Sequence, residues 1–286
     1  MKKVTLLIIL FSTLIHAQKN YDNYDKLWKE VQQLEKDDLP KSANKKVAAI
    51  YKKATSDDNA PQLVKCLMHQ SKYALIVEEE AILITIHNFE SAINKAEFPT
   101  KNILESVLAG LYWQYFQQNR WQYYNRTNTS EKVDDKDFRT WDLHTIFKEI
   151  HTHYQNSLQN GLLAQQKPLA DFNEILHTQK GSQDYRPSLY DFLAHNALNF
   201  YKTGESNLAQ PSYKFEIENS NLLGKNEDFI KVDLTSKDTL SQKRLALKLF
   251  RNLTLFHHGN KNTKALVDLT LNRLDFVKTN ARFPEV

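Results

Sequence analysis

The chain has 286 residues but only six glycines, seven prolines and one cysteine. So few turn-forming residues argue against an all-β fold and favour a mostly helical protein. The single cysteine excludes an internal disulfide framework. The 38 basic and 34 acidic residues are spread without a basic block, which argues against a nucleic-acid partner.

The first segment, MKKVTLLIILFSTLIHAQ, has the three parts of a secretory signal peptide. Lys2 and Lys3 give a positive start, residues 4–15 are mostly apolar, and Ala17 is a small residue suited to cleavage. We therefore expect residues 1–17 to be removed and the protein to be exported to the periplasm or cell surface. The bulky Ile15 leaves an uncleaved anchor as the alternative. No later apolar stretch is long enough to span a membrane.

The next segments carry apolar residues at helical spacing and predict amphipathic helices. Tyr24, Trp28 and Val31 mark the first, Pro40 suits the first turn of the second, and Asn59 is a capping signal for the third. The same pattern continues through 78–96, 99–119, 141–160, 168–178 and 186–203. Short connections between such helices predict antiparallel hairpins and hence an α-solenoid that is tetratricopeptide-like, without a fixed 34-residue repeat.

The pattern changes between residues 205 and 238. Alternation at Tyr213, Phe215 and Ile217 predicts a short extended or β segment near 208–235, lying over the helices. A final helix pair is expected near 240–258 and 261–279. The predicted organisation is a signal peptide (1–17), a helical-repeat domain (18–204), a connector (205–238) and a C-terminal pair (239–286), which we expect to continue into a longer protein.

Seven aromatic rings lie within residues 112–124, in the stretch LYWQYFQQNRWQYYNRT. Leu104, Leu108, Tyr112 and Phe116 fall at steps of four, which is typical of a core-facing helix. Beyond Asn119 the pattern breaks, and we interpret the rest as a loop pinned by Trp121 and Tyr124. The alternative is a ligand-stacking surface, whose candidate residues are Trp113, Trp121, Tyr123 and Trp141.

Other residues with catalytic or metal-binding chemistry form no recognisable motif. His144 and His151 share a helix face, but they and His153, His257 and His258 lack metal-site spacing, so we expect no metal and no cofactor. The acidic runs 78–80 and 134–137 point in different directions and predict solvated surfaces. Cys66 lies in an apolar helical pattern and predicts a buried, inert thiol. We therefore expect no enzyme activity.

Three extended segments carry a family resemblance. LYWQYFQQNRWQYYNRT with DFRTWDLHTIFKEI and RPSLYDFLAHNALNFY, and also the opening YDKLWKEVQQLEKDDLPKSANKKVAAIYKKA, resemble the N-terminal region of bacterial alpha-2-macroglobulin family proteins. The resemblance implies an exported chain at the front of a longer endopeptidase inhibitor. That family's bait segment and thioester are absent here, since Cys66 lies in K-C-L and not in C-G-E-Q.

The resemblance implies a non-enzymatic scaffold that docks the remainder of the macroglobulin-like polypeptide, proteases or other envelope proteins. The alternative is a stand-alone periplasmic helical-repeat module that binds a peptide or glycan on its concave face. Under the alternative, Trp113, Trp121 and Tyr123 would be exposed together.

Overall fold

The computed structural model describes residues 22–77, 80–127, 132–205 and 208–283, and this part of the chain is all-α. It contains no β-strand, only two isolated bridges. The expected mostly helical class is therefore confirmed.

The main helices are α1 (Asp22–Lys36), α2 (Pro40–Ser56), α3 (Ala60–Val77), α4 (Ala81–Ile93), α5 (Thr100–Gln118), α7 (Leu143–Ser157), α10 (Leu189–Tyr201), α12 (Gln242–Gly259) and α13 (Thr263–Asn280). The short ones are α6 (Arg120–Tyr124), η1 (Phe138–Thr140), α8 (Gly161–Gln165), η2 (Leu169–Ile175), α9 (Ser182–Tyr185), η3 (Ser220–Leu223) and α11 (Asn226–Phe229).

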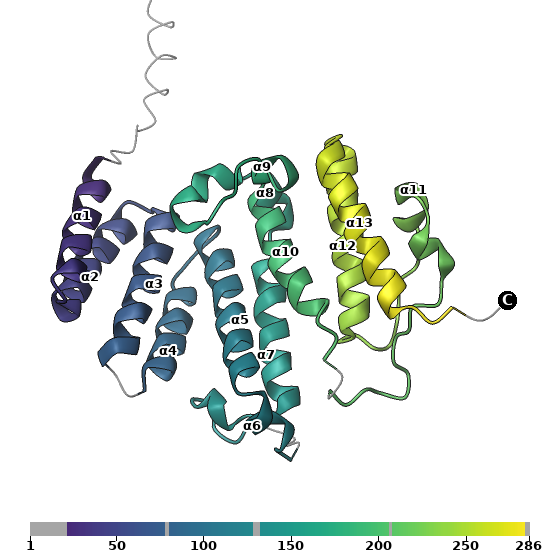
Figure 1. The fold of residues 1–286 in the computed structure, drawn as a ribbon, viewed down its shortest axis with the longest axis horizontal. Coiled ribbons are helices and arrows are strands. Elements are labelled where there is room, and N and C mark those ends of the chain that lie inside the picture. Colours follow the sequence, from purple (N-terminus) through teal and green to yellow (C-terminus); the bar gives the residue numbers. More distant parts are fainter. Residues whose placement is uncertain (1–21, 78–79, 128–131, 206–207, 284–286) are drawn as a thin grey trace, which may run out of the picture.

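The helices α1 to α5 follow one another across the molecule, then α7 and α10, and α11 to α13 lie at the end opposite α1 (Figure 1). Each of α1 to α4 packs against the next helix in the chain. Pro40 stands in the first turn of α2, and the Asn59 side chain accepts a hydrogen bond from the Gln62 amide at 3.3 Å. Both end signals read from the sequence are thus confirmed.

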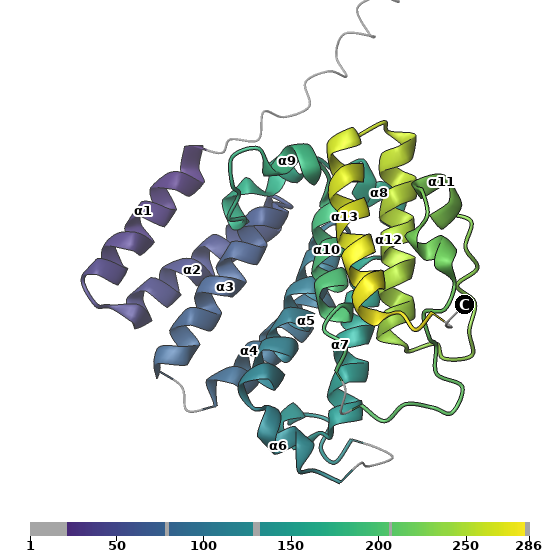
Figure 2. The ribbon, with the colours of Figure 1, turned by 45° about the vertical axis from the view of Figure 1, so that its right-hand side comes forward.

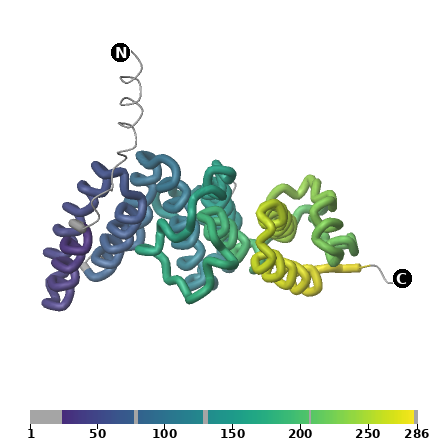
Figure 3. Tube along the Cα trace, turned by 90° about the horizontal axis from the view of Figure 1, so that it is seen from above, coloured from purple at the N-terminus to yellow at the C-terminus, as the bar shows by residue number. Residues whose placement is uncertain are grey.

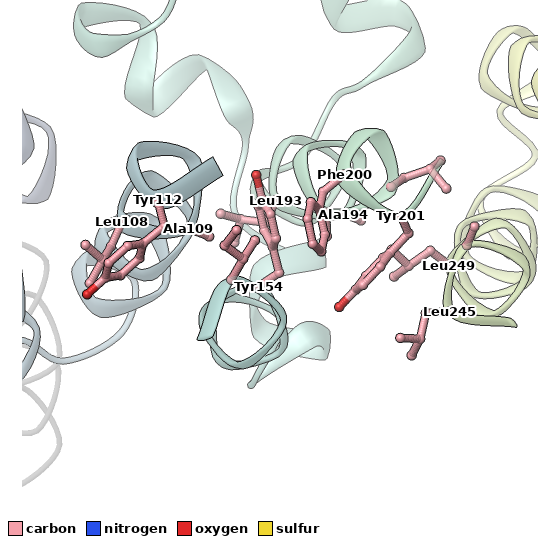
Figure 4. Packing of buried hydrophobic residues seen from close by; sticks show 14 of the residues in the cluster. Leu108, Ala109, Tyr112, Tyr154, Leu193, Ala194, Phe200, Tyr201, Leu245 and Leu249 are labelled. Carbon is pink, nitrogen blue, oxygen red and sulfur yellow. The ribbon is translucent and has the colours of Figure 1, made fainter. Parts of the chain in front are cut away.

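Two apolar clusters hold these helices together. The smaller joins α1, α2 and α3 through residues such as Trp28, Val31 and Ile50. The larger runs from α3 to α13, and Figure 4 shows its central part, where side chains of α5, α7, α10 and α12 meet. Tyr112 and Phe200, in the middle of this core, are almost completely buried.

The start of α10 differs from the expected helix at 186–203. Ser188 caps the helix in a capping box with Asp191, so α10 begins after Pro187. The segment before it, expected as a helix at 168–178, is the 3₁₀ helix η2. The Leu169 amide donates to Pro187 O at 2.8 Å, which ties η2 to the start of α10 and replaces a continuing α-helical ladder.

Of the two alternatives for the segment near 208–235, extended or β, the β alternative is wrong. These residues form an irregular connection with η3 and α11, and Figure 3 shows them beside α12 and α13 at the far end of the molecule. No neighbouring strand is present in the described chain, and arginine side chains satisfy the backbone instead. Arg273 donates to Leu222 O and Gly224 O, and Arg244 donates to Leu234 O. Alternating apolar residues therefore indicated partial burial and not sheet pairing.

The predicted signal peptide lies outside the described residues. Among the helices that the structure describes, none has the length and apolar character needed to cross a bilayer.

A basic groove as the candidate functional site

The four aromatic residues expected as an interaction surface do not lie on a common surface. Tyr123 and Trp141 are 1% and 2% exposed, so neither can contact a ligand. Trp113 is half-buried, and its ring lies against Phe116, Phe147 and Phe200, with centroids 5.2–5.7 Å apart. Only Trp121 is open to solvent, at 80% exposure. The core-facing interpretation of this stretch is the one that the geometry supports.

The idea that Trp121 pins the loop after Asn119 is wrong. Residues 120–124 form the short helix α6, and the Trp121 side chain points away from the core. Tyr123 is the buried anchor, while the Tyr124 hydroxyl donates to Glu205 Oε2 at 2.9 Å. In α6, residues 121 and 123 lie on different faces, so Tyr123 is buried and Trp121 is exposed.

The histidines are divided among separate environments. His144 and His151 lie on one face of α7, as expected, and both line a cavity. His153 instead faces α5, with Nδ1 2.5 Å from Glu105 Oε2, and His257 is buried against Asp191 at 2.7 Å. Within the described ranges, no group of three or more His, Cys, Asp or Glu side chains is placed to hold a metal ion.

The remaining sequence candidates have ordinary structural roles. Cys66 is fully buried, and burial raises the pKa of its thiol to about 12, which makes the thiol inert at neutral pH. Glu80 and Asp137 both contact the Arg139 guanidinium at 2.8 Å. Residues 78 and 79 of the first acidic run lie outside the described chain.

A groove of about 600 Å³ is present elsewhere, on helices α2, α3 and α4. Its two sides are formed by one face of α2 and one face of α4, where the lining residues recur at steps of three and four. The base is formed by α3, which packs between α2 and α4. Its lining residues are Lys41, Asn44, Lys45, Ala48, Tyr51, Leu67, Gln70, Ala74, Ile84, Asn88, Ser91, Ala92 and Lys95. We call this feature the α2–α4 groove, and Figure 1 shows its three helices in sequence.

The α2–α4 groove is positively charged, because it is lined by three lysines and by no carboxylate. None of Lys41, Lys45 and Lys95 makes an ion pair or side-chain hydrogen bond with the described chain. Outside the groove, α2 and α3 carry five lysines: Lys46, Lys53 and Lys72 reach carboxylates at 2.6–2.9 Å. Lys65 lies over the Trp28 ring, and Lys52 makes no ion pair within the described chain. The groove thus brings three lysines without an ion pair together on one surface feature that has no carboxylate.

The groove also presents unused hydrogen-bonding groups. The side chains of Asn44, Gln70, Asn88 and Ser91 make no hydrogen bond with any residue that the structure describes. An amide side chain both donates and accepts, which matches the alternating N–H and C=O groups of an extended peptide backbone. Small residues on its two sides, Ala48 of α2 and Ala92 of α4, let a ligand approach closely.

Sequence reasoning missed this groove. The signal was present, since Lys41, Asn44, Lys45 and Ala48 repeat the helical spacing on the face of α2 that is not in the core. A polar helix face normally indicates contact with solvent. Only the fold shows that α4 brings a second polar face beside it.

Comparison with known proteins assigns no relative to this chain. No family model, no curated protein and no solved structure matches it. The structure therefore defines the class at the level of an all-α protein with a basic groove, and the resemblance to macroglobulins rests on the sequence segments alone.

Proposed function

We propose that this protein is a non-enzymatic binding module whose α2–α4 groove holds an acidic, extended peptide segment of a partner protein. The observation that supports this function is the set of three unpaired lysines and four unused polar side chains on one concave feature. Lysine ammonium groups attract carboxylates, and the amides would bind the peptide backbone.

Charge and size favour a peptide over other polymers. Binding of nucleic acid relies on many phosphate contacts. The groove offers only three lysines for such contacts, and the chain as a whole has nearly equal numbers of basic and acidic residues. A glycan is usually bound by stacking on exposed aromatic faces, and the groove has one partly buried ring, Tyr51. A glycan and a nucleic acid are alternative outcomes of the experiment below.

The proposal includes a finer description of the fold, an α-solenoid of antiparallel helix pairs that is tetratricopeptide-like. Its support is that α1 to α5 follow one another through short connections and pack neighbour on neighbour. Repeats of this kind produce concave surfaces between successive helices, and these surfaces commonly bind peptides.

We also keep the proposal that the module belongs to an exported, macroglobulin-like polypeptide of the cell envelope, where it would dock the inhibitor body. The long segments quoted from the sequence are its support. Reading the open reading frame beyond Val286 tests it: a macroglobulin-like β region is expected there, and its absence would count against this origin but not against the groove.

Selection from a phage library of random dodecapeptides tests the proposed function. We expect the peptides selected on the protein to be rich in Asp and Glu, and their synthetic forms to bind in fluorescence anisotropy titrations. Reversing the three groove charges (Lys41→Glu, Lys45→Glu and Lys95→Glu) should weaken binding by more than about tenfold, because attraction becomes repulsion.

The matched control reverses three exposed lysines outside the groove, Lys101, Lys180 and Lys231, and so changes the net charge equally. This control should bind the selected peptides as the unchanged protein does. Equal losses in both variants would show non-specific charge attraction, and selected peptides without acidic residues would also contradict the proposal. Tighter binding of heparin or single-stranded DNA than of the selected peptides at the same groove would show that the ligand is a glycan or a nucleic acid and not a peptide.

A further inference from the structure

A second cavity, of about 520 Å³, lies between α7 and α10 on one side and the C-terminal part of the described chain on the other. It is bounded by α7, the end of α10, the segment 208–215 and the segment 237–243. Figure 2 shows the chain leaving α10 and running past the ends of α12 and α13 around this position. We call it the α7–α10 cavity. Its volume is within the range of small-molecule sites.

One side of this cavity is rich in hydrogen-bond donors. His144, Lys148 and His151 follow one another along α7 at steps of four and three and all line the cavity. Lys148 and also Lys237, from the facing segment, make no ion pair within the described chain. The other two lining lysines, Lys214 and Lys243, share the carboxylate of Glu216 at 2.7 and 2.9 Å.

The lining carboxylates are already engaged. Glu205 is held by the Arg120 guanidinium at 3.0 Å and by the Tyr124 hydroxyl. Asp238 accepts a hydrogen bond from the Phe215 amide at 3.0 Å. With Lys148 and Lys237 unpaired, the cavity carries a net positive charge.

The hydrogen-bond network assigns an available N–H group to His151. Gln155 donates to the Tyr201 hydroxyl at 2.9 Å, and that hydroxyl is 2.8 Å from His151 Nδ1. If Nδ1 carried the proton, the buried Tyr201 hydroxyl would accept twice and its own proton would lack a partner. Tyr201 therefore donates to Nδ1, and the ring proton lies on Nε2. Burial lowers the pKa of His151, which keeps the ring neutral at pH 7.

A second donor is left without an acceptor at Gln242, which also lines the cavity. Its Oε1 accepts from the Glu205 amide at 3.0 Å, and this fixes the orientation of the side-chain amide. Its Nε2 is buried and has no hydrogen-bond partner among the described residues. A buried donor without an acceptor is costly, so an anion or other acceptor there would be stabilising.

Apolar side chains also line the cavity, most of them from the segment 208–215. Leu208, Pro211 and Phe215 are only partly covered, while Tyr213 and Leu240 are 57% and 43% exposed. Figure 4 shows the rings of Phe200 and Tyr201 at the end of α10, where they form the inner limit of the cavity. A cavity that presents both hydrogen-bond donors and exposed apolar groups matches a ligand with two chemically different ends.

We propose that the α7–α10 cavity binds a small amphipathic anion, an apolar chain that ends in a carboxylate. The carboxylate accepts hydrogen bonds from His151 Nε2 and Gln242 Nε2 and is attracted by Lys148 and Lys237. The chain lies against the apolar residues of segment 208–215. This site is separate from the α2–α4 groove and does not depend on the proposed function.

Calorimetric titration with decanoate, decanol and decyltrimethylammonium below their micelle concentrations tests the proposal. Decanoate should bind at least tenfold more tightly than decanol, and the cation should not bind. In the double variant Lys148→Met and Lys237→Met, the ratio of the affinities for decanoate and decanol should fall to near unity, since only the contacts with the apolar chain remain. Equal affinities of the unchanged protein for decanoate and decanol would overturn the proposal.

A near-isosteric variant tests the donor directly. Gln242→Glu keeps the acceptor for the Glu205 amide but replaces the donor with an anion, so decanoate affinity should fall more than tenfold. The matched control for Gln242→Glu is the exposed Gln32→Glu, and the control for the double lysine variant is Lys101→Met with Lys180→Met. Both controls should bind decanoate as the unchanged protein does. The charge-reversed groove variant should also bind decanoate normally.

The carboxylate could belong to a small amphiphile or to the C-terminus of a peptide. Titration with a short apolar peptide that has a free C-terminus, and with its amidated form, separates these two sources. Tighter binding of the free peptide than of decanoate, lost on amidation, would show that the occupant is a chain terminus and would contradict the small amphiphile.

Discussion

At the scale of single residues, His153 is the group whose ionisation the fold controls most clearly. Its Nδ1 is 2.5 Å from Glu105 Oε2, and Nε2 is 3.7 Å from Glu149 Oε1, which is an ion pair and not a hydrogen bond. Burial alone would lower the pKa of His153, but the two carboxylates outweigh it and raise the pKa to about 9. His153 is therefore charged at neutral pH, and it links α7 to α5.

We expect this charge to make stability depend on pH. The unfolded pKa is near 6.5, so the stabilisation is complete below that pH and is lost as pH rises through about 9. His153→Gln should lower the free energy of unfolding by about 3 kcal/mol at pH 6, and by much less at pH 10. Urea unfolding at both pH values measures this, and an equal loss at both would show that His153 acts through packing alone.

At the scale of elements, α5 shows what the aromatic stretch does. Phe116 is completely buried and contacts the rings of Trp113, Tyr123 and Phe147 at 5.0–5.5 Å between centroids. Trp121, five residues later, is mostly exposed. The sequence spacing predicted the first role correctly, but the prediction of a loop pinned by Trp121 after Asn119 was wrong, since α6 lies there and Trp121 is exposed.

This contrast gives a paired prediction. Phe116→Ala should lower the free energy of unfolding by about 3–5 kcal/mol, because it removes a buried ring and leaves a cavity. Trp121→Ala should change it by less than about 0.5 kcal/mol, since the side chain makes little buried contact. Chemical denaturation measures both values. Similar losses would mean that Trp121 is covered in solution.

The helices were largely predictable because each depends on local spacing and end signals, such as Pro40 and Asn59. The connection at 208–235 was not. Its backbone accepts hydrogen bonds from Arg244, ten residues after Leu234, and from Arg273, 49 residues after Gly224. The alternation of apolar residues does not show such contacts. Alternating apolar residues predicted a strand because the pattern reports partial burial and cannot report the absence of a neighbouring strand.

At the scale of the whole molecule, both candidate sites arise where elements meet, so neither could be located from the sequence. Lys95 joins Lys41 and Lys45 only because α3 holds α4 beside α2. Likewise, Gln242 of α12 reaches the histidine face of α7 only because α10 lies between these helices. The sequence did indicate that His144 and His151 share a face, and this was the part of the second site that could be predicted.

The central claim is that an acidic peptide lies in the α2–α4 groove, and its position can be measured directly. A selected acidic peptide with a nitroxide label is added to isotopically labelled protein, and paramagnetic broadening of backbone amide signals is recorded by NMR. We predict the strongest broadening at Asn44, Gln70 and Asn88, with little effect on α12 and α13. Broadening centred on another part of the molecule, or spread evenly over it, would contradict the claim.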